Sequence, residues 1–162
     1  MEAKARKTVI ITGGTTGIGK ATAIKFAEND YNVVITSRDA KKEAAIKNEF
    51  KDKGMEVDFQ VLDVRNEGQV EALIKETVAK YGKLDVMVNN SGISLGNAVL
   101  AETESDDLKQ MLDTNVMGVY YVTSRVSAPC WRISRPSRTA TPGAPPRVCS
   151  SRRTRWGPSS RR

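Results

Sequence analysis

The stretch Thr12-Gly13-Gly14-Thr15-Thr16-Gly17-Ile18-Gly19 decides how the rest of the sequence is interpreted. An apolar run precedes it, and a segment with helical spacing follows it. Glycine lets the backbone turn tightly and approach phosphate oxygens, and a helix N-terminus presents free N–H groups to an anion. A glycine loop between a strand and a helix therefore predicts phosphate binding, although glycines also end strands and pack helices closely.

Apolar runs and helical spacings alternate along the chain around this loop. Four short apolar runs, each typical of a buried parallel strand, cover Thr8–Thr12, Asn32–Thr36, Val57–Leu62 and Leu84–Asn89. Helices are expected over about Gly17–Asn29 and Asp39–Lys53, after Asn66 and after Thr103. Asn66 with Gln69 resembles a capping box, and Thr103 with its partner Asp106 again suits an N-terminal cap.

The alternation predicts an α/β fold. Strands joined by right-handed helical crossovers form a doubly wound parallel sheet, here Rossmann-like, with its first four strands in the spatial order 3-2-1-4. The pattern stops after the fourth strand and the helix that follows it. We therefore expect a truncated sheet whose fourth strand is an uncovered edge.

The composition changes near Ser127. All 19 acidic residues precede this point, whereas all six prolines and a run of arginines follow it. A segment without a periodic apolar stripe cannot offset the entropy lost on ordering. We predict a nucleotide-binding domain over residues 1–126 and a disordered tail rich in Arg, Pro and Ser over residues 127–162. Our hypothesis is that this tail is foreign to the fold, as a frameshift or an aberrant splice would make it.

The same composition limits the other classes of function. No apolar run approaches the roughly 20 residues of a membrane span, so we expect a cytoplasmic protein without a membrane partner. Cys130 and Cys149 show no metal-site spacing, so no metal or disulfide is expected. One alternative function remains, in which a truncated, non-enzymatic product binds nucleic acid non-specifically through its basic tail. No nucleic-acid-binding motif accompanies that tail, so we do not favour this role.

The choice of nucleotide depends on the residues beside the loop. Gly14, Gly19 and Lys20 also fit the start of an ATPase phosphate loop, but Ala21 stands where Ser or Thr would hold Mg²⁺. The second strand ends in Ser37 and Arg38, where NAD-binding folds place an acid for the ribose 2′-hydroxyl. A hydroxyl followed by a guanidinium favours the 2′-phosphate of NADP over NAD. Alternatively, Arg38 is a surface residue paired with Asp39.

Four motifs in order resemble the short-chain dehydrogenase/reductase family over residues 7–126: Thr12-Gly13-x-x-x-Gly17-x-Gly19, Leu62-Asp63-Val64, Asn89-Asn90-Ser91-Gly92 and Asn115. The resemblance implies an NADP-dependent oxidoreductase for an alcohol/carbonyl pair, such as a 3-oxoacyl or small ketone reductase, and a homo-oligomer. It also implies that Asp63 hydrogen-bonds the adenine and that Val64 supplies a backbone contact. The residues expected to bind the cofactor are Gly13, Thr15, Thr16, Gly17, Ile18, Gly19, Ser37, Arg38, Asp63, Val64, Asn90, Ser91 and Gly92.

Asn115 lies within an apolar stripe of the last helix, formed by Leu108, Met111, Leu112, Val116, Val119 and Val122 or Thr123. Its amide is therefore expected to be buried and hydrogen-bonded, in many proteins only to backbone. The resemblance implies that Asn115 is the asparagine of the catalytic tetrad and holds a water in the proton relay.

The rest of that catalytic set is not found in the sequence. None of Tyr31, Tyr81, Tyr120 and Tyr121 is followed four residues later by a lysine, so the family's Tyr-x-x-x-Lys is missing. Tyr121 with Arg125 is the nearest imitation, but a guanidinium cannot share a proton as an amine can. We therefore expect this chain to bind the cofactor without turning it over.

Overall fold

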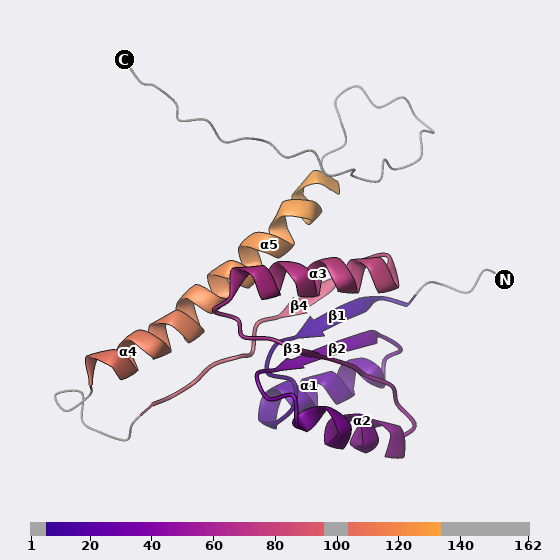
Figure 1. The fold of residues 1–162 in the computed structure, drawn as a ribbon. Coiled ribbons are helices and arrows are strands. Elements are labelled where there is room, and N and C mark those ends of the chain that lie inside the picture. Colours follow the sequence, from indigo (N-terminus) through magenta and orange to yellow (C-terminus); the bar gives the residue numbers. More distant parts are fainter. Residues whose placement is uncertain (1–5, 96–103, 134–162) are drawn as a thin grey trace, which may run out of the picture.

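The computed structural model describes residues 6–95 and 104–133, and for residues 127–133 only the backbone. Figure 1 shows a sheet with helices on both faces. The strands are β1 (Thr8–Ile11), β2 (Asn32–Ser37), β3 (Asp58–Val61) and β4 (Val86–Val88). The helices are α1 (Gly17–Ala27), α2 (Lys42–Asp52), α3 (Glu67–Tyr81), α4 (Ser105–Leu112), the π-helical turn η2 (Asp113–Met117) and α5 (Gly118–Ile133).

The predicted topology is confirmed. All strand pairs are parallel, and the strand order is β3-β2-β1-β4. Parallel strands end at the same edge of the sheet, so the segments that follow β1, β2, β3 and β4 meet there. Within the described residues no strand pairs with the outer side of β4, whose three residues are half-buried.

Two apolar clusters hold the layers together, one on each face of the sheet. Alternate residues of a strand point to opposite faces, so Ile10 and Val34 belong to one cluster while their neighbours in β1 and β2 belong to the other. The first cluster joins the sheet to α1 and α2 through Ala23, Ile46 and Phe50. The second joins it to α3 and α5 through Val70, Leu73, Ile74 and Val122. Both faces of the central strands are thus covered, which explains their continuous apolar sequence.

The start of α3 corrects the predicted capping box. The Asn66 side chain accepts a hydrogen bond from the Gln69 backbone N–H at 3.1 Å, as expected of the cap. The Gln69 side chain does not return to the Asn66 N–H; it accepts from the Asp63 N–H at 2.9 Å. The reason is that the Asn66 N–H already donates to the Asp63 carbonyl, so the glutamine serves the turn after β3. At α4, Glu104 is the N-cap and provides no side-chain cap, and Thr103 lies outside the described residues.

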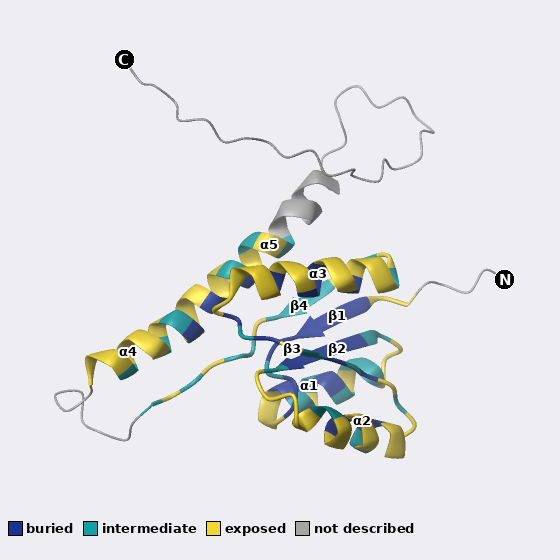
Figure 2. Cartoon of the chain, in the orientation of Figure 1, coloured by how far each residue is buried: buried dark blue, intermediate teal, exposed yellow. Residues whose placement is uncertain are grey.

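The apolar stripe predicted for the last helix is not buried as expected. Val122 is fully buried, but Leu112 is 50% exposed and Val116 is 56% exposed. Figure 2 shows that α4 extends away from the sheet, with exposed residues along its length. The described residues provide nothing on the far side of this helix for the stripe to pack against. Asn115 is accordingly exposed rather than buried.

Helix α5 crosses the predicted domain boundary at residue 126 and continues to Ile133. Residues 134–162, which make up most of the predicted tail, lie outside the described residues. The hypothesis that the tail binds nucleic acid therefore concerns mainly residues outside the described part of the chain. No helix in the described part of the chain is both long and apolar enough to cross a membrane.

Candidate functional site

The glycine loop leaves the sheet between β2 and β4 and is tied to both. The Thr12 N–H donates to the Val88 carbonyl at 3.0 Å, and the Gly14 N–H donates to the Thr36 carbonyl at 3.1 Å. Gly13 and Gly17 have φ values of 67° and 54°, a left-handed conformation that other residues rarely adopt. Thr16 is the N-cap of α1, but its side chain makes no capping hydrogen bond. The loop therefore presents the first turn of α1 without a side-chain cap, as an anion site requires.

Thr12 and Asn90 hold the loop against the segment that follows β4. The Thr12 hydroxyl accepts hydrogen bonds from the backbone N–H groups of Asn90 and Ser91, both at 3.0 Å. The Asn90 side-chain amide donates to the carbonyls of Thr12 at 3.0 Å and Gly13 at 3.1 Å. A Cβ atom built on Gly19 would overlap the Asn90 amide and the Gly13 carbonyl. Glycine at position 19 is therefore required for this close approach, and Asn90 has a positioning role in the loop.

A cavity of about 230 Å³ lies at this carboxyl edge of the sheet. Nine of the residues predicted to bind the cofactor line it: Gly13, Thr15, Thr16, Ser37, Arg38, Val64, Asn90, Ser91 and Gly92. Four further lining residues were missed by the sequence analysis: Lys42, Leu62, Ile93 and Thr114. Leu62 begins the Leu62-Asp63-Val64 motif but was not itself expected to bind the cofactor. No local motif marks the other three, because they meet the cavity only when distant segments pack. Lys42 alone could have been suspected, since it is a cation shortly after Arg38 at the start of a helix.

The polar end of the cavity is positively charged. Ser37, Arg38 and Lys42 line it, and none of the described residues contributes a carboxylate to the lining. The alternative pairing of Arg38 with Asp39 is not found, because among the described residues no ion pair includes Arg38. The Asp39 carboxylate instead accepts a hydrogen bond from the Lys41 N–H at 2.9 Å. This end of the cavity suits a phosphate group.

Lys20 does not face the glycine loop. Its ammonium donates to the Glu49 carboxylate of α2 at 3.2 Å. This contact lowers the pKa of Glu49, because the hydrogen bond from Lys20 favours the charged carboxylate. The lysine of an ATPase phosphate loop would instead reach the bound phosphates. The geometry thus disfavours the phosphate-loop alternative.

The other predicted residues lie beside the cavity rather than in its lining. Gly17, Ile18 and Gly19 form the first turn of α1, where the Ile18 side chain is 81% exposed. Asp63 follows β3, and its carboxylate accepts hydrogen bonds from the Arg65 guanidinium, the shortest at 2.6 Å. These hydrogen bonds hold the pKa of the Asp63 carboxyl below its ordinary value.

The side-chain amide of Asn115 forms two hydrogen bonds with the backbone of one residue in the segment after β4. Its Oδ1 accepts from the Ile93 N–H, and its Nδ2 donates to the Ile93 carbonyl, both at 2.8 Å. The side chain therefore pairs with backbone in the manner of a neighbouring strand. It ties η2 to the segment that carries Asn90, Ser91 and Gly92, and so helps to form the wall of the cavity.

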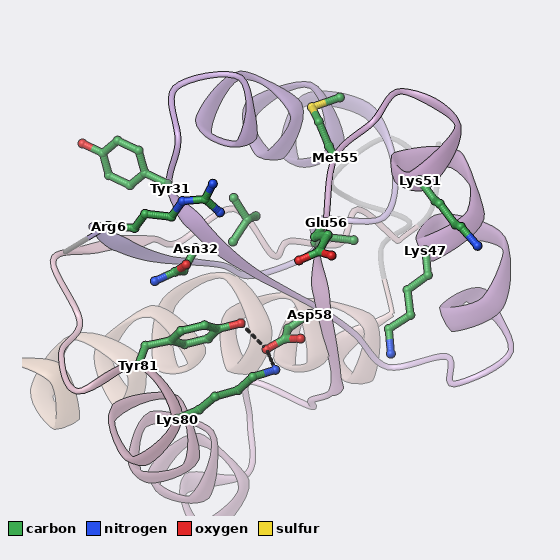
Figure 3. Close-up of a pocket in the computed structure, with 12 residues that line it drawn as sticks. Arg6, Tyr31, Asn32, Lys47, Lys51, Met55, Glu56, Asp58, Lys80 and Tyr81 are labelled. Atoms are coloured by element: carbon green, nitrogen blue, oxygen red, sulfur yellow. Dashed lines mark hydrogen bonds and ion pairs between the residues drawn. The ribbon is translucent and has the colours of Figure 1, made fainter. Parts of the chain in front are cut away.

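A larger hollow, of about 490 Å³, lies at the opposite edge, where β2 and β3 begin (Figure 3). There the Asp58 carboxylate accepts hydrogen bonds from the Tyr81 hydroxyl and the Lys80 ammonium, both at 2.5 Å. Burial opposes ionisation of Asp58, but these two hydrogen bonds outweigh it and lower the pKa of the carboxyl. Burial and the neighbouring Asp58 charge raise the pKa of Tyr81. Because Asp58, Lys80 and Tyr81 pair with one another and the glycine loop lies at the other edge, we assign these three residues a structural role.

Comparison with known proteins supports the assignment of the fold. The family model described as short chain dehydrogenase matches residues 7–134. The chain belongs to the short chain dehydrogenase family. A 3beta-hydroxysteroid dehydrogenase of Mediterraneibacter gnavus is 38% identical over 115 residues, which are 71% of this chain and 42% of that protein. A 3-oxoacyl-[acyl-carrier-protein] reductase FabG of Staphylococcus aureus is 38% identical over 120 residues, which are 72% of this chain and 48% of that protein.

Solved structures of the family show the same architecture. ElxO with NADP bound is 43% identical, with a TM-score of 0.75 over 80% of this chain and 52% of that one. A short chain dehydrogenase/reductase from Burkholderia phymatum in complex with NAD is 32% identical, with a TM-score of 0.70 over 80% of this chain and 45% of that one. The chain spans about half the length of the proteins it matches.

Proposed function

We propose that this chain provides the NADP-binding half of an oxidoreductase that transfers a hydride between NADP(H) and an alcohol/carbonyl pair. The observation that carries the proposal is the cavity at the carboxyl edge, where the glycine loop meets Ser37, Arg38 and Lys42 and no described residue adds a carboxylate to the lining. The uncapped first turn of α1 suits the pyrophosphate, and the cationic end suits the 2′-phosphate. The similar protein ElxO has NADP bound in its solved structure, which favours the same cofactor here.

The substrate class rests on membership of the family and on the names of its relatives. These relatives are named as reductases or dehydrogenases of a 3-oxoacyl group or a hydroxysteroid, so we propose a small-molecule carbonyl or alcohol substrate. A 3-oxoacyl or small ketone substrate fits this proposal. A homo-oligomeric, cytoplasmic enzyme is the corresponding proposal for the whole protein.

For the 162-residue chain we propose cofactor binding without turnover. The proton donor of the reaction has to be a group of suitable pKa beside the alkoxide that forms, and the chain has no Tyr-x-x-x-Lys to provide it. Arg125, four residues after Tyr121, forms an ion pair with Glu67 of α3 at 3.2 Å, so its guanidinium is directed to that helix. Asn115 is proposed as the remaining member of the catalytic set, with its amide also fixing the cavity wall through Ile93.

Titration of the purified chain with NADPH and with NADH tests the cofactor assignment. We expect NADPH to bind more tightly, and Ser37→Asp to reverse the preference because a carboxylate repels the 2′-phosphate and can accept a hydrogen bond from a 2′-hydroxyl. NADPH fluorescence or calorimetry measures both affinities. An unchanged ratio of the two affinities in Ser37→Asp would show that the 2′-phosphate pocket is elsewhere. Oxidation of NADPH by this chain with a ketone would contradict the absence of turnover.

A further inference from the structure

One buried polar atom at the carboxyl-edge cavity has no partner. Thr114 lines the cavity and is only 4% exposed, and its Oγ1 makes no hydrogen bond to any residue that the structure describes. A buried hydroxyl without a partner costs free energy, so buried polar groups in proteins are almost always paired. Such a group beside a cavity indicates that a ligand supplies the missing partner.

The position of Thr114 follows from a close contact between η2, α5 and the segment after β3. A Cβ atom built on Gly118 would lie 2.6 Å from the Val64 Cγ2, so only glycine at the start of α5 allows this approach. The approach brings Thr114 to the wall of the cavity that Leu62 and Val64 form. Leu62 and Val64 are themselves buried, so the hydroxyl lies beside an apolar surface.

The same wall adjoins the proposed 2′-phosphate pocket. The Leu62 N–H donates to the Ser37 carbonyl at 3.0 Å, which places the end of β3 directly beside the end of β2. In NADP the 2′-phosphate is carried by the ribose that bears the adenine. A cofactor whose 2′-phosphate contacts Ser37 and Arg38 therefore directs its adenine toward Leu62 and Val64, and an apolar wall suits the flat faces of a base.

The size of the cavity agrees with one end of a dinucleotide. Its volume of about 230 Å³ is below the roughly 300–1,000 Å³ of a pocket that encloses a whole small ligand. The adjoining Asp63 carboxylate does not line the cavity and already accepts the hydrogen bonds of Arg65. Among Leu62, Val64 and Thr114, which form this wall, Thr114 thus provides the side-chain polar group that is available to a ligand.

We propose that the Thr114 hydroxyl forms a hydrogen bond with the adenine base of NADP(H). This inference rests on the proposed function and adds a residue that determines recognition of the base. A hydroxyl can donate to a ring nitrogen or accept from the exocyclic amino group, so either edge atom of adenine provides the partner.

Thr114→Val tests the inference because valine keeps the shape of threonine and removes the hydroxyl. We expect binding of NADPH by the full chain to weaken about 3- to 10-fold, the usual effect of one lost hydrogen bond. Adenosine 2′,5′-bisphosphate, which has the base and lacks the nicotinamide, should weaken by the same factor. The melting temperature without ligand should not fall, because the variant removes an unpaired buried hydroxyl.

Thr77→Val is the matched control. Thr77 is 1% exposed, its Oγ1 also has no hydrogen-bond partner, and it lies in α3 away from the cavity lining. This variant should leave both affinities unchanged. Thr114→Ser keeps the hydroxyl and should bind nearly as the wild type does, and Thr114→Ala gives a second variant without the hydroxyl if valine prevents folding.

The outcomes separate the inference from the proposed function. If the variants without the hydroxyl bind both ligands as tightly as the wild type, Thr114 does not contact the cofactor. If only NADPH binding weakens, the hydroxyl serves the nicotinamide end and the assignment to adenine is wrong. If the wild-type chain binds neither NADPH nor the bisphosphate, the proposed function itself fails, and the inference with it.

Discussion

Two sets of polar residues at opposite edges of the sheet differ in whether they are paired within the chain. At the edge where the strands begin, Asp58 is held by Lys80 and Tyr81. At the edge where the strands end, Arg38 has no ion-pair partner among the described residues, and the Thr114 hydroxyl has no hydrogen-bond partner. Groups that are paired within the chain stabilise the fold, whereas unpaired groups around a cavity remain available to a ligand. The contrast predicts that substitutions at one edge change binding and those at the other change stability.

The largest effect is expected where the glycine loop contacts the segment after β4. In Gly19→Ala the new methyl group overlaps the Asn90 amide and the Gly13 carbonyl, so the loop has to move. NADPH binding should weaken about 100-fold or more, since displaced loop N–H groups no longer meet the phosphates.

Gly17→Ala provides the comparison for this variant. Unlike Gly19, Gly17 has a positive φ, and no described atom lies within 4 Å of a Cβ built there, so alanine introduces strain of about 1 kcal/mol without overlap. Fluorescence titration and thermal unfolding of both variants measure the difference. Equal losses of affinity in the two variants would contradict a special role for the close contact of Gly19 with Asn90.

A smaller effect is expected from the cation at the start of α2. Lys42→Ala removes a charge from the cavity and should weaken NADPH binding about 10-fold, with little change for NADH. The difference between wild type and variant should diminish as salt is added, because salt screens exposed charges. Lys41→Ala is the matched control, since Lys41 is an adjacent exposed lysine outside the lining. Comparable losses in both would indicate general attraction of an anion rather than a defined phosphate site.

The smallest effect is expected at the opposite edge, and on stability alone. Tyr81→Phe removes one of the two hydrogen bonds that lower the pKa of Asp58, and should reduce the free energy of unfolding by about 1 kcal/mol at neutral pH. Because the folded-state pKa of Asp58 lies below its unfolded value, this contribution is present above the unfolded pKa and disappears as pH falls through the folded pKa. Urea unfolding of wild type and variant between pH 7 and pH 3 measures this contribution to the free energy of unfolding. A change in NADPH affinity in this variant would break the contrast between the two edges.

Much of the fold was predictable because it depends on short-range pattern. The apolar runs gave four strands at nearly the observed positions, and the glycine spacing fixed the turn between β1 and α1. The helix that includes Asn115 was less predictable, because an apolar spacing shows which face could be buried and not what covers it. Leu112 and Val116 are exposed for this reason. The partner predicted for the Gln69 side chain was also wrong. The side chain accepts from the Asp63 N–H instead, and the position of that N–H depends on the path of the chain after β3.

The sequence by itself determined the order of the strands, the glycine loop and the edge of the sheet at which a ligand is expected, because these follow from local periodicity and from the backbone freedom of glycine. Only the tertiary structure decided which distant side chains share one cavity. Lys42, Ile93 and Thr114 come from three separate segments, and no spacing along the chain relates them. Their meeting depends on how closely helices and loops pack, as Gly118 against Val64 shows. The unpaired hydroxyl of Thr114 became visible only when that packing was known.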